Sequence, residues 1–320
     1  MSFPMKSLPI AVAALALGLA ACGRDAGKST DTDTGAQADA SQAAFAQVQQ
    51  TWRDHRRESL LKPDGWTSLV GLHWVDRGSH YLGSDADNGI RLAMGPAHLG
   101  MIDVKDDHIR FVPDKSAALT LDGQPLAGAT SLKADVDEGG PSVIGFDDGK
   151  GIATIIKRGD RYALRVKHAD APTRTGFAGL EYWPADPQWK IGGKFVPHAA
   201  GKTIEIANII GTTEPVANPG AVEFERDGRT YRIEALDEGD GELFLVFADR
   251  TNGHGSYGAG RFLYAPMPDA SGKVVLDFNQ AYSPPCAFTA FATCPLPPRE
   301  NRLDLAITAG EKAYRKPNQG

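Results

Sequence analysis

The chain has 320 residues, with 34 lysines and arginines and 40 aspartates and glutamates, so its formal net charge is -6 at pH 7. Nucleic-acid binding needs clustered Lys and Arg side chains against the phosphates. This sequence has no such cluster, and we expect no nucleic-acid partner. Beyond the first residues, no apolar run approaches the ~20 residues that a helix needs to span a bilayer.

The first residues have the pattern of an export signal. Lys6 supplies a positive charge, and an apolar run too short to span a bilayer follows from Leu8 to Leu19. The run ends in Leu19-Ala20-Ala21-Cys22, which resembles a bacterial lipobox, where the cysteine is lipidated and the segment before it is removed. We expect a signal peptide at 1–21 and a membrane anchor at Cys22. An ordinary signal peptide is the alternative. In a lipoprotein, Gly23 stands where an Asp would resemble an inner-membrane retention signal, so we favour an anchor on the periplasmic face of the outer membrane.

Residues 22–42 are rich in Ala, Asp, Thr, Gly and Ser, so we expect a flexible tether. From 43 to 62 the pattern is helical, because Phe45, Val48, Trp52 and Leu60 fall on roughly one face. Lys62-Pro63-Asp64-Gly65 then ends the helix. We expect it to dock on the first β-domain, and a helix that binds a partner is the alternative.

After Gly65, short β-branched and aromatic runs alternate with Gly, Asp and Asn turns, which is typical of all-β proteins. We therefore predict a mainly β fold. An N-terminal helix precedes a small β-sandwich at 65–170 and a second antiparallel β-sandwich or barrel domain at 171–320. In the second domain, Asp227-Gly228 stands between two strand-like runs and predicts a type I′ hairpin.

Some segments of the first half resemble a forkhead-associated sandwich. They are Tyr81-Leu82-Gly83-Ser84, Asn88-Gly89-Ile90-Arg91-Leu92, His108 to Val112 and Leu119-Thr120-Leu121-Asp122-Gly123. In that family an arginine after the glycine grips the phosphate of a phosphopeptide, and a Ser-x-x-His motif follows. Here Ser84 replaces the arginine, and Gly95-Pro96-Ala97-His98 replaces the serine motif. The resemblance therefore implies a degenerate member without phosphothreonine binding.

The stretch from Asp277 to Asn301 is dense in proline and aromatic residues, and it ends in Cys294-Pro295-Leu296-Pro297-Pro298-Arg299-Glu300-Asn301. Together with the segments Glu181 to Trp189 and Tyr257 to Leu263, it resembles the bacterial domain-of-unknown-function family 1684. The resemblance covers most of the chain after Trp66. It implies an exported member of a β-rich family that has no established activity.

Cys286 and Cys294 lie in this stretch. In an exported protein, oxidation to a disulfide is the default, and a loop this short permits it. A reduced pair or a functional thiol is the alternative. Metal binding is disfavoured, since the spacing does not fit a zinc site and no histidine is near in sequence.

A group of polar side chains brackets the stretch and could converge on one site. Its members are Arg261, Asp277, Asn279, Tyr282, Glu300 and Asn301. They fit a ligand site in which Asp277 or Glu300 is a general acid–base and Arg261 holds an anion. They also fit a structural network that satisfies the backbone of a proline-rich loop.

Two classes of function remain from the sequence. The first is a non-catalytic, lipid-anchored protein of the cell envelope that binds a small molecule or an envelope partner. The second is a periplasmic, hydrolase-like enzyme that uses Arg261, Asp277 and Glu300. The chain has no metal-ligand spacing, no cofactor loop and no nucleophile motif, and His254 occupies the first glycine position of a G-x-S-x-G elbow. We therefore favour the first class and expect no cofactor.

Overall fold

The computed structural model describes residues 31–316 of the chain, and side chains from residue 40. The expected signal peptide, Cys22 and the first part of the expected tether lie outside the described residues. Within the described part, no helix has both the length and the apolar character needed to cross a membrane. The fold is mainly β, as the sequence predicts.

Helix α1 covers Asp31–Leu60. It begins earlier than residue 43, so the prediction of a flexible tether up to residue 42 is wrong for residues 31–42. The reason is composition: Ala36, Ala38 and Ala40 carry the highest helix propensity, and Gln37 is also a good helix former. The scarcity of large apolar residues in this segment excludes a buried core, but it does not exclude a helix.

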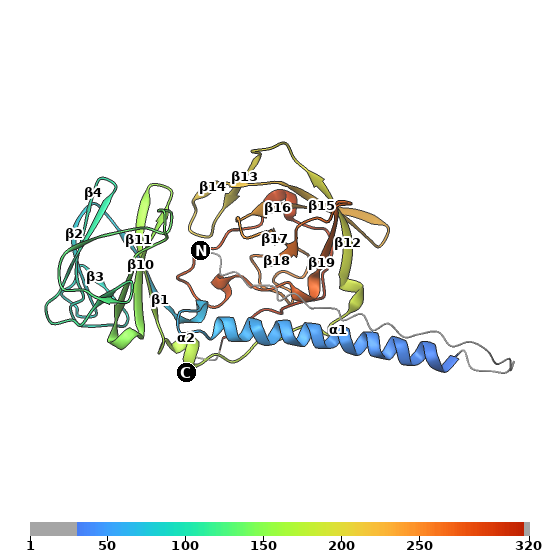
Figure 1. The fold of residues 1–320 in the computed structure, drawn as a ribbon, viewed down its shortest axis with the longest axis horizontal. Coiled ribbons are helices and arrows are strands. Elements are labelled where there is room, and N and C mark those ends of the chain that lie inside the picture. Colours follow the sequence, from blue (N-terminus) through green and yellow to red (C-terminus); the bar gives the residue numbers. More distant parts are fainter. Residues whose placement is uncertain (1–30, 317–320) are drawn as a thin grey trace, which may run out of the picture.

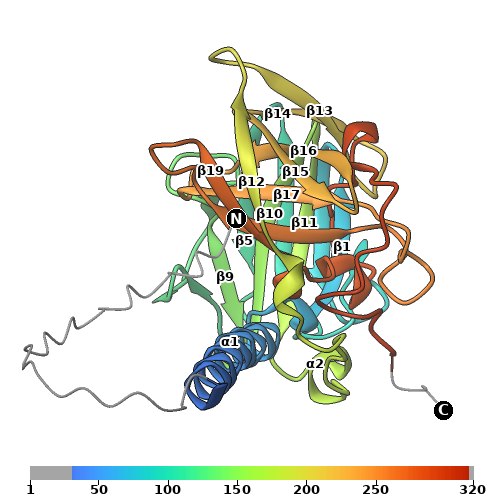
Figure 2. The same ribbon diagram turned by 90° about the vertical axis from the view of Figure 1, so that its right-hand side faces the viewer.

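Helix α1 docks on the second β-domain, whereas we expected contact with the first. Figure 1 shows it lying alongside that domain, with its C-terminal end towards the first, and Figure 2 views it nearly end-on. Arg56 makes a 2.7 Å ion pair with the fully buried Glu311. Gln49 donates to Asp277 at 2.8 Å, and Arg53 donates to the Trp183 carbonyl at 3.0 Å. Polar contacts from one face therefore fix the helix.

The first β-domain is a sandwich of two sheets around one apolar core. One sheet has the order β1-β11-β10-β9-β6-β7 and the other β3-β2-β4-β5-β8. The strands are β1 Leu69–Val75, β2 Gly78–Gly83, β3 Ile90–Arg91, β4 Gly100–Lys105, β5 His108–Pro113, β6 Thr120–Leu121, β7 Gln124–Pro125, β8 Thr130–Leu132, β9 Val143–Phe146, β10 Gly151–Arg158 and β11 Arg161–His168. Ser84 donates to the Gly95 carbonyl at 2.9 Å, and the expected absence of phosphothreonine binding stays a prediction.

The second β-domain is built on one six-stranded sheet in the order β18-β17-β16-β15-β12-β19, with the hairpin β13-β14 beside it. Its strands are β12 Lys190–Pro197, β13 Thr203–Ala207, β14 Thr213–Ala217, β15 Gly220–Arg226, β16 Arg229–Asp237, β17 Glu242–Phe247, β18 Arg261–Pro266 and β19 Lys273–Asp277. The edge strands β18 and β19 lie beside each other, so the sheet is nearly closed. Asp227 and Gly228 have φ values of 52° and 72°, which confirms the predicted hairpin turn.

Several short helices lie between the strands or next to them. They are α2 Pro172–Thr175, η1 Trp66–Ser68, η2 Asp147–Gly149, η3 Pro187–Trp189, η4 Phe278–Gln280, η5 Pro285–Ala287 and η6 Arg299–Asn301. The two domains meet through a small apolar cluster in which Leu69 of the first packs with Leu236, Phe244 and Val246 of the second. A cavity lies beside this apolar cluster.

Candidate ligand-binding site

A cavity of about 250 Å³ lies where helix α1 and the two β-domains meet. Most of the side chains that line it are aromatic, basic or acidic. The lining includes Trp52, Arg56, Ser59, Lys62, Asp64, Trp66, Arg158, Arg165, Lys167, Glu238, Asp240, Glu242, Phe244, Phe262, Tyr264, Tyr282, Thr293 and Cys294. Clefts between domains are common places for ligand sites.

The second domain supplies an aromatic wall. Phe244 of β17 stands opposite Tyr264 of β18 in the antiparallel register, and their rings stack at 4.8 Å. Phe262 lies two residues before Tyr264 and so faces the same side of the sheet. Tyr282 pairs with Phe262, and their rings meet edge-on at 5.8 Å. Burial raises the pKa of Tyr264 and of Tyr282, so both phenols stay neutral.

The first domain supplies a basic wall. Arg165 and Lys167 are two residues apart on β11, so they share the sheet face opposite the apolar core. Arg158, at the end of β10, reaches the same place. Arg158 Nε and Arg165 Nη2 each donate to the Thr293 hydroxyl oxygen at 3.3 Å. Two guanidinium groups from one domain thus converge on one hydroxyl of the other.

The charges on this wall are unevenly compensated. Arg158 pairs with Asp135 at 2.8 Å. No carboxylate among the described residues forms a salt bridge with Arg165, and its buried Nε has no hydrogen-bond acceptor there. Burial, and then repulsion from Arg158, lowers the pKa of Arg165 to about 10. Burial likewise lowers the pKa of Lys167 to about 8, against the attraction of Asp64 and with a smaller contribution from the charge of Arg165. Lys167 also donates to the Asp64 carbonyl.

Acidic side chains line the cavity from the β16–β17 turn of the second domain. They are Glu238, Asp240 and Glu242. Tyr264 donates its phenol proton to Glu238 at 2.7 Å. Burial raises the pKa of Glu242, and the charge of Asp240 raises it further. The cavity is therefore electrically polar, with a basic wall in one domain and acidic groups in the other.

The loop that carries Thr293 is closed by a disulfide. The predicted Cys286–Cys294 bond is confirmed, with the two Cα atoms 6.2 Å apart. The Cys294 carbonyl accepts from the Ile209 amide at 3.0 Å, which ties the loop to the β13–β14 hairpin. Phe288 of the same loop is buried against Leu60 of helix α1. Thr293 is therefore presented from an anchored loop.

The residues that the sequence singled out do not form one cluster. Arg261 is fully buried, pairs with Asp249 at 2.7 Å, and donates to the carbonyls of Ile307 and Ala309. Its predicted neighbour Asp277 instead accepts from Gln49. Arg261 therefore serves the interior of the second domain rather than an open anion site.

The remaining candidates divide between packing and surface. Asn279 is fully buried and exchanges hydrogen bonds with the backbone of Asp186 at 2.9 Å in both directions. Asn301 is also fully buried, and Glu300 is exposed. Only Tyr282, among the six candidates, lines the cavity. The structural network that we kept as an alternative describes most of this set.

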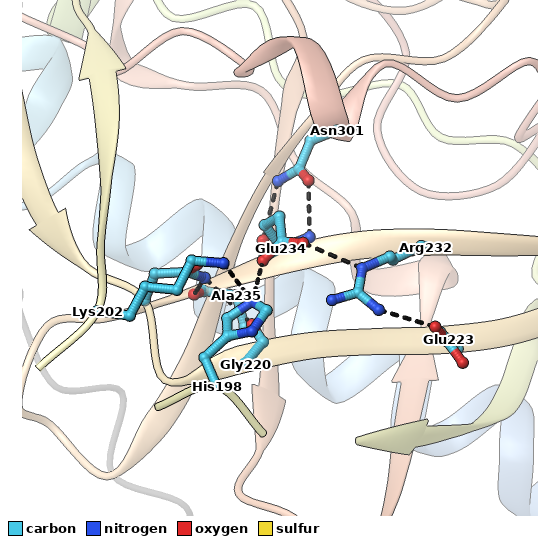
Figure 3. Close-up of polar contacts among 9 residues, drawn as sticks. His198, Lys202, Gly220, Glu223, Arg232, Glu234, Ala235 and Asn301 are labelled. Carbon is cyan, nitrogen blue, oxygen red and sulfur yellow. Dashed lines mark hydrogen bonds and ion pairs between the residues drawn. The ribbon is translucent and has the colours of Figure 1, made fainter. Parts of the chain in front are cut away.

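A separate polar cluster surrounds Glu234 of β16 (Figure 3). Its carboxylate lies 2.7 Å from His198 Nε2 and accepts from Arg232 Nε at 3.1 Å. Asn301 accepts from the Glu234 amide at 2.7 Å and donates to its carbonyl at 2.9 Å. Burial alone would raise the pKa of Glu234, but hydrogen bonds from His198, Arg232 and Asn218 outweigh it and lower the pKa. Each charge here is paired, so the cluster stabilises the sheet.

In the described part of the chain, one group of side chains is close enough to hold a metal ion. It consists of Asp85, Asp87 and His98, whose ligand atoms lie within 4.8 Å of one another. Both aspartates are exposed, and exposed acidic groups of this kind are common without an ion. We assign no metal site there.

Comparison with known proteins places the chain in a family. Residues 175–312 match the model of a protein of unknown function, DUF1684. The chain belongs to the DUF1684 family. A solved structure of an uncharacterized protein from Haloarcula marismortui is 32% identical, with 43% of this chain and 78% of that protein covered and a TM-score of 0.37. No curated protein matches.

Only part of the cavity lining lies within the residues that match DUF1684. The aromatic wall, the acidic groups and Thr293 lie inside residues 175–312, whereas helix α1 and the basic wall lie before them. The site predicted from the sequence does not include Arg158, Arg165 and Lys167, which lie before the matched segment. A signal was present, since basic residues alternate with buried apolar ones along Arg161–His168. What the signal could not reveal is Thr293, which lies 128 residues further along the chain.

Proposed function

We propose that the protein is a non-catalytic binding protein of the cell envelope, held to a membrane through a lipid on Cys22, whose cavity takes a small organic anion. Arg165 is the observation that carries this proposal. Its guanidinium lines the cavity, has a buried Nε without an acceptor, and lacks a carboxylate partner among the described residues. A bound anion would supply that partner through the bidentate geometry that guanidinium groups favour.

The size and lining of the cavity support a small, partly apolar ligand. Ligand sites commonly measure about 300–1,000 Å³, so a cavity of about 250 Å³ suits a small molecule rather than a peptide. The rings of Phe244, Tyr264 and Tyr282 offer apolar area. The acidic groups of the β16–β17 turn disfavour an anion at their side of the cavity. The anionic end of a ligand is thereby directed to Arg165.

The test is calorimetric titration of the purified full-length protein in mild detergent with 4-ethylbenzoate, phenyl sulfate and phenyl phosphate. We expect binding that weakens at least tenfold in Arg165→Met, which keeps the apolar stem and removes the charge. Arg110→Met is the matched control, because Arg110 is an exposed residue of β5 outside the cavity lining. Absence of binding for all three anions, or equal loss in both variants, would refute an anion site.

The anchor has its own test. If Cys22 is lipidated, the protein partitions into the detergent phase, and Cys22→Ser moves it to the aqueous phase with an unprocessed signal. Equal partitioning of the variant and the wild-type protein would contradict the lipid anchor without affecting the proposed binding site.

A further inference from the structure

Glu242 is an acidic side chain of the cavity lining, and its charge has no cationic partner among the described residues. It is half-buried at the start of β17, and no donor in the described part of the chain forms a hydrogen bond or a salt bridge with its carboxylate. Asp240 is exposed, and its carboxylate accepts from the Glu242 amide at 3.2 Å. Burial and the charge of Asp240 raise the pKa of Glu242, whereas a nearby cation would lower it by favouring the charged form.

Glu242 stands next to the aromatic wall, on the same face of β17. Alternate residues of a strand share a face, so Glu242 and Phe244 point to the same side, with their Cα atoms about 7 Å apart. Leu243, between them, packs in the core of the second domain on the other face. A cation at Glu242 would therefore lie beside the stacked rings of Phe244 and Tyr264, and aromatic rings attract cations through their faces.

The first domain offers the complementary charge in the same cavity. The Arg165 guanidinium has a buried Nε without an acceptor, and no carboxylate of the described residues forms a salt bridge with it. Arg165 Nη2 donates to the Thr293 hydroxyl oxygen at 3.3 Å, and the hydroxyl proton has no acceptor among the described residues. Lys167 does not belong to this end, because it donates to the Asp64 carbonyl. One guanidinium and one hydroxyl suit a single carboxylate.

We propose that the ligand is a small aromatic zwitterion, with its carboxylate at Arg165 and Thr293 and its ammonium group at Glu242. This rests on the proposed function, because it names the ligand class of the same cavity. The two charges lie at opposite ends of the ligand, since Arg165 and Glu242 belong to different domains, and the ring between them packs on the aromatic wall. Each charged end then meets a group of opposite charge, as partly buried charges require. A simple anion would leave Glu242 without a cation.

The closing experiment compares ligands of matched shape by calorimetry on the purified full-length protein in mild detergent. At about pH 7 a carboxylate and an alkylammonium group are both charged. The compounds 4-(aminomethyl)benzoate and 4-ethylbenzoate have the same shape, and only the first carries an ammonium group. A third compound, 4-isopropylbenzylamine, keeps the ammonium group and replaces the carboxylate by an uncharged group of similar shape. We expect the zwitterion to bind at least tenfold tighter than either of the others.

Variants identify the groups responsible. Glu242→Gln keeps the size of the side chain and removes its charge, so we expect it to abolish the preference for 4-(aminomethyl)benzoate over 4-ethylbenzoate without weakening 4-ethylbenzoate. Arg165→Met should weaken both compounds. Glu205→Gln, an exposed change on β13 outside the cavity lining, is the matched control and should alter neither. A purely structural Glu242 would affect the two compounds equally.

The outcomes separate the two proposals. Equal affinity for 4-(aminomethyl)benzoate and 4-ethylbenzoate, with both weakened by Arg165→Met, overturns the zwitterion and leaves the anion site standing. A preference for the zwitterion that persists in Glu242→Gln overturns the assignment of its ammonium group to Glu242. Binding of 4-isopropylbenzylamine as tight as that of the zwitterion, and insensitive to Arg165→Met, overturns the anion site itself. Absence of binding by all three compounds overturns both proposals.

Discussion

Arg261 begins the edge strand β18 and Arg165 lies on β11, and the two arginines differ in their charge partners. Arg261 has no exposed surface, and the Asp249 carboxylate and two backbone carbonyls surround it. Arg165 lines an open cavity, and no carboxylate of the described residues pairs with it. Burial lowers the pKa of both. The paired Asp249 opposes this at Arg261, whereas at Arg165 repulsion from Arg158 adds to it and is larger than the opposing attraction of Asp135.

The difference indicates which charge serves the fold and which is available to a ligand. A buried charge costs several kcal/mol unless it is paired and hydrogen-bonded, so a retained charge without a partner needs another explanation. The Nε of each arginine is buried without an acceptor, but in the second domain the charge of Arg261 has a carboxylate partner in Asp249 and needs no ligand. At Arg165 the missing partner is the argument for a site.

The largest expected effect follows from Arg261→Met. Removing the guanidinium leaves the Asp249 carboxylate buried and unpaired, which should cost about 3–5 kcal/mol in free energy of unfolding. Urea unfolding followed by tryptophan fluorescence measures it. Affinity for phenyl sulfate, measured on the fraction that remains folded, should be unchanged. A loss of less than about 1 kcal/mol in free energy of unfolding would contradict the contrast with Arg165, because it would mean that Arg261 is not structurally essential.

The disulfide should matter less for stability. Replacing Cys286 and Cys294 together by serine removes a short covalent loop, and we expect a loss of about 2–3 kcal/mol on the chain-entropy model. Because the loop carries Thr293, ligand affinity should also fall, unlike in Arg261→Met. Thermal unfolding with and without reductant checks the first expectation. Full stability of the reduced wild-type protein would show that the loop is held by its packing alone.

Glu234 extends the comparison to a paired charge that titrates. Its pKa is lowered in the folded protein, so the contribution of its charge to stability is present above the unfolded value of about 4.3 and is lost as the pH falls through the lower folded value. Glu234→Gln should therefore cost about 1–2 kcal/mol near neutral pH and progressively less below about pH 4. Glu225→Gln, an exposed change on β15, is the control and should show no such trend.

The fold was largely accessible from the sequence, because strand runs and turn residues are local signals. Asp227-Gly228 fixed a hairpin, and the spacing of Cys286 and Cys294 permitted the disulfide that the structure contains. The predicted start of α1 is too late, because the helix propensity of Ala36 to Ala40 extends the helix without any large apolar residue.

The site was not accessible in the same way. Polar residues that are close in sequence, such as Asp277, Asn279 and Asn301, turned out to satisfy backbone groups of loops and strands. The cavity is instead formed by surfaces that meet only after both domains and α1 have packed. Arg165 and Thr293 carry no shared local signal, so their proximity depends on tertiary structure alone.

The smallest expected effect is the stability change in Arg165→Met. The fold lowers the pKa of Arg165, which means that the folded state disfavours its charge, and methionine keeps the apolar stem without that cost. Loss of the hydrogen bond from Arg165 to Thr293, 3.3 Å long, works in the opposite direction. We expect the free energy of unfolding to change by less than about 0.5 kcal/mol, as for ordinary surface substitutions. The pKa of Lys167, followed by NMR of its side chain, should rise at the same time, because Arg165 no longer repels its charge. A loss of about 2 kcal/mol or more would place Arg165 with Arg261 among the structural arginines and remove the main support for a ligand site.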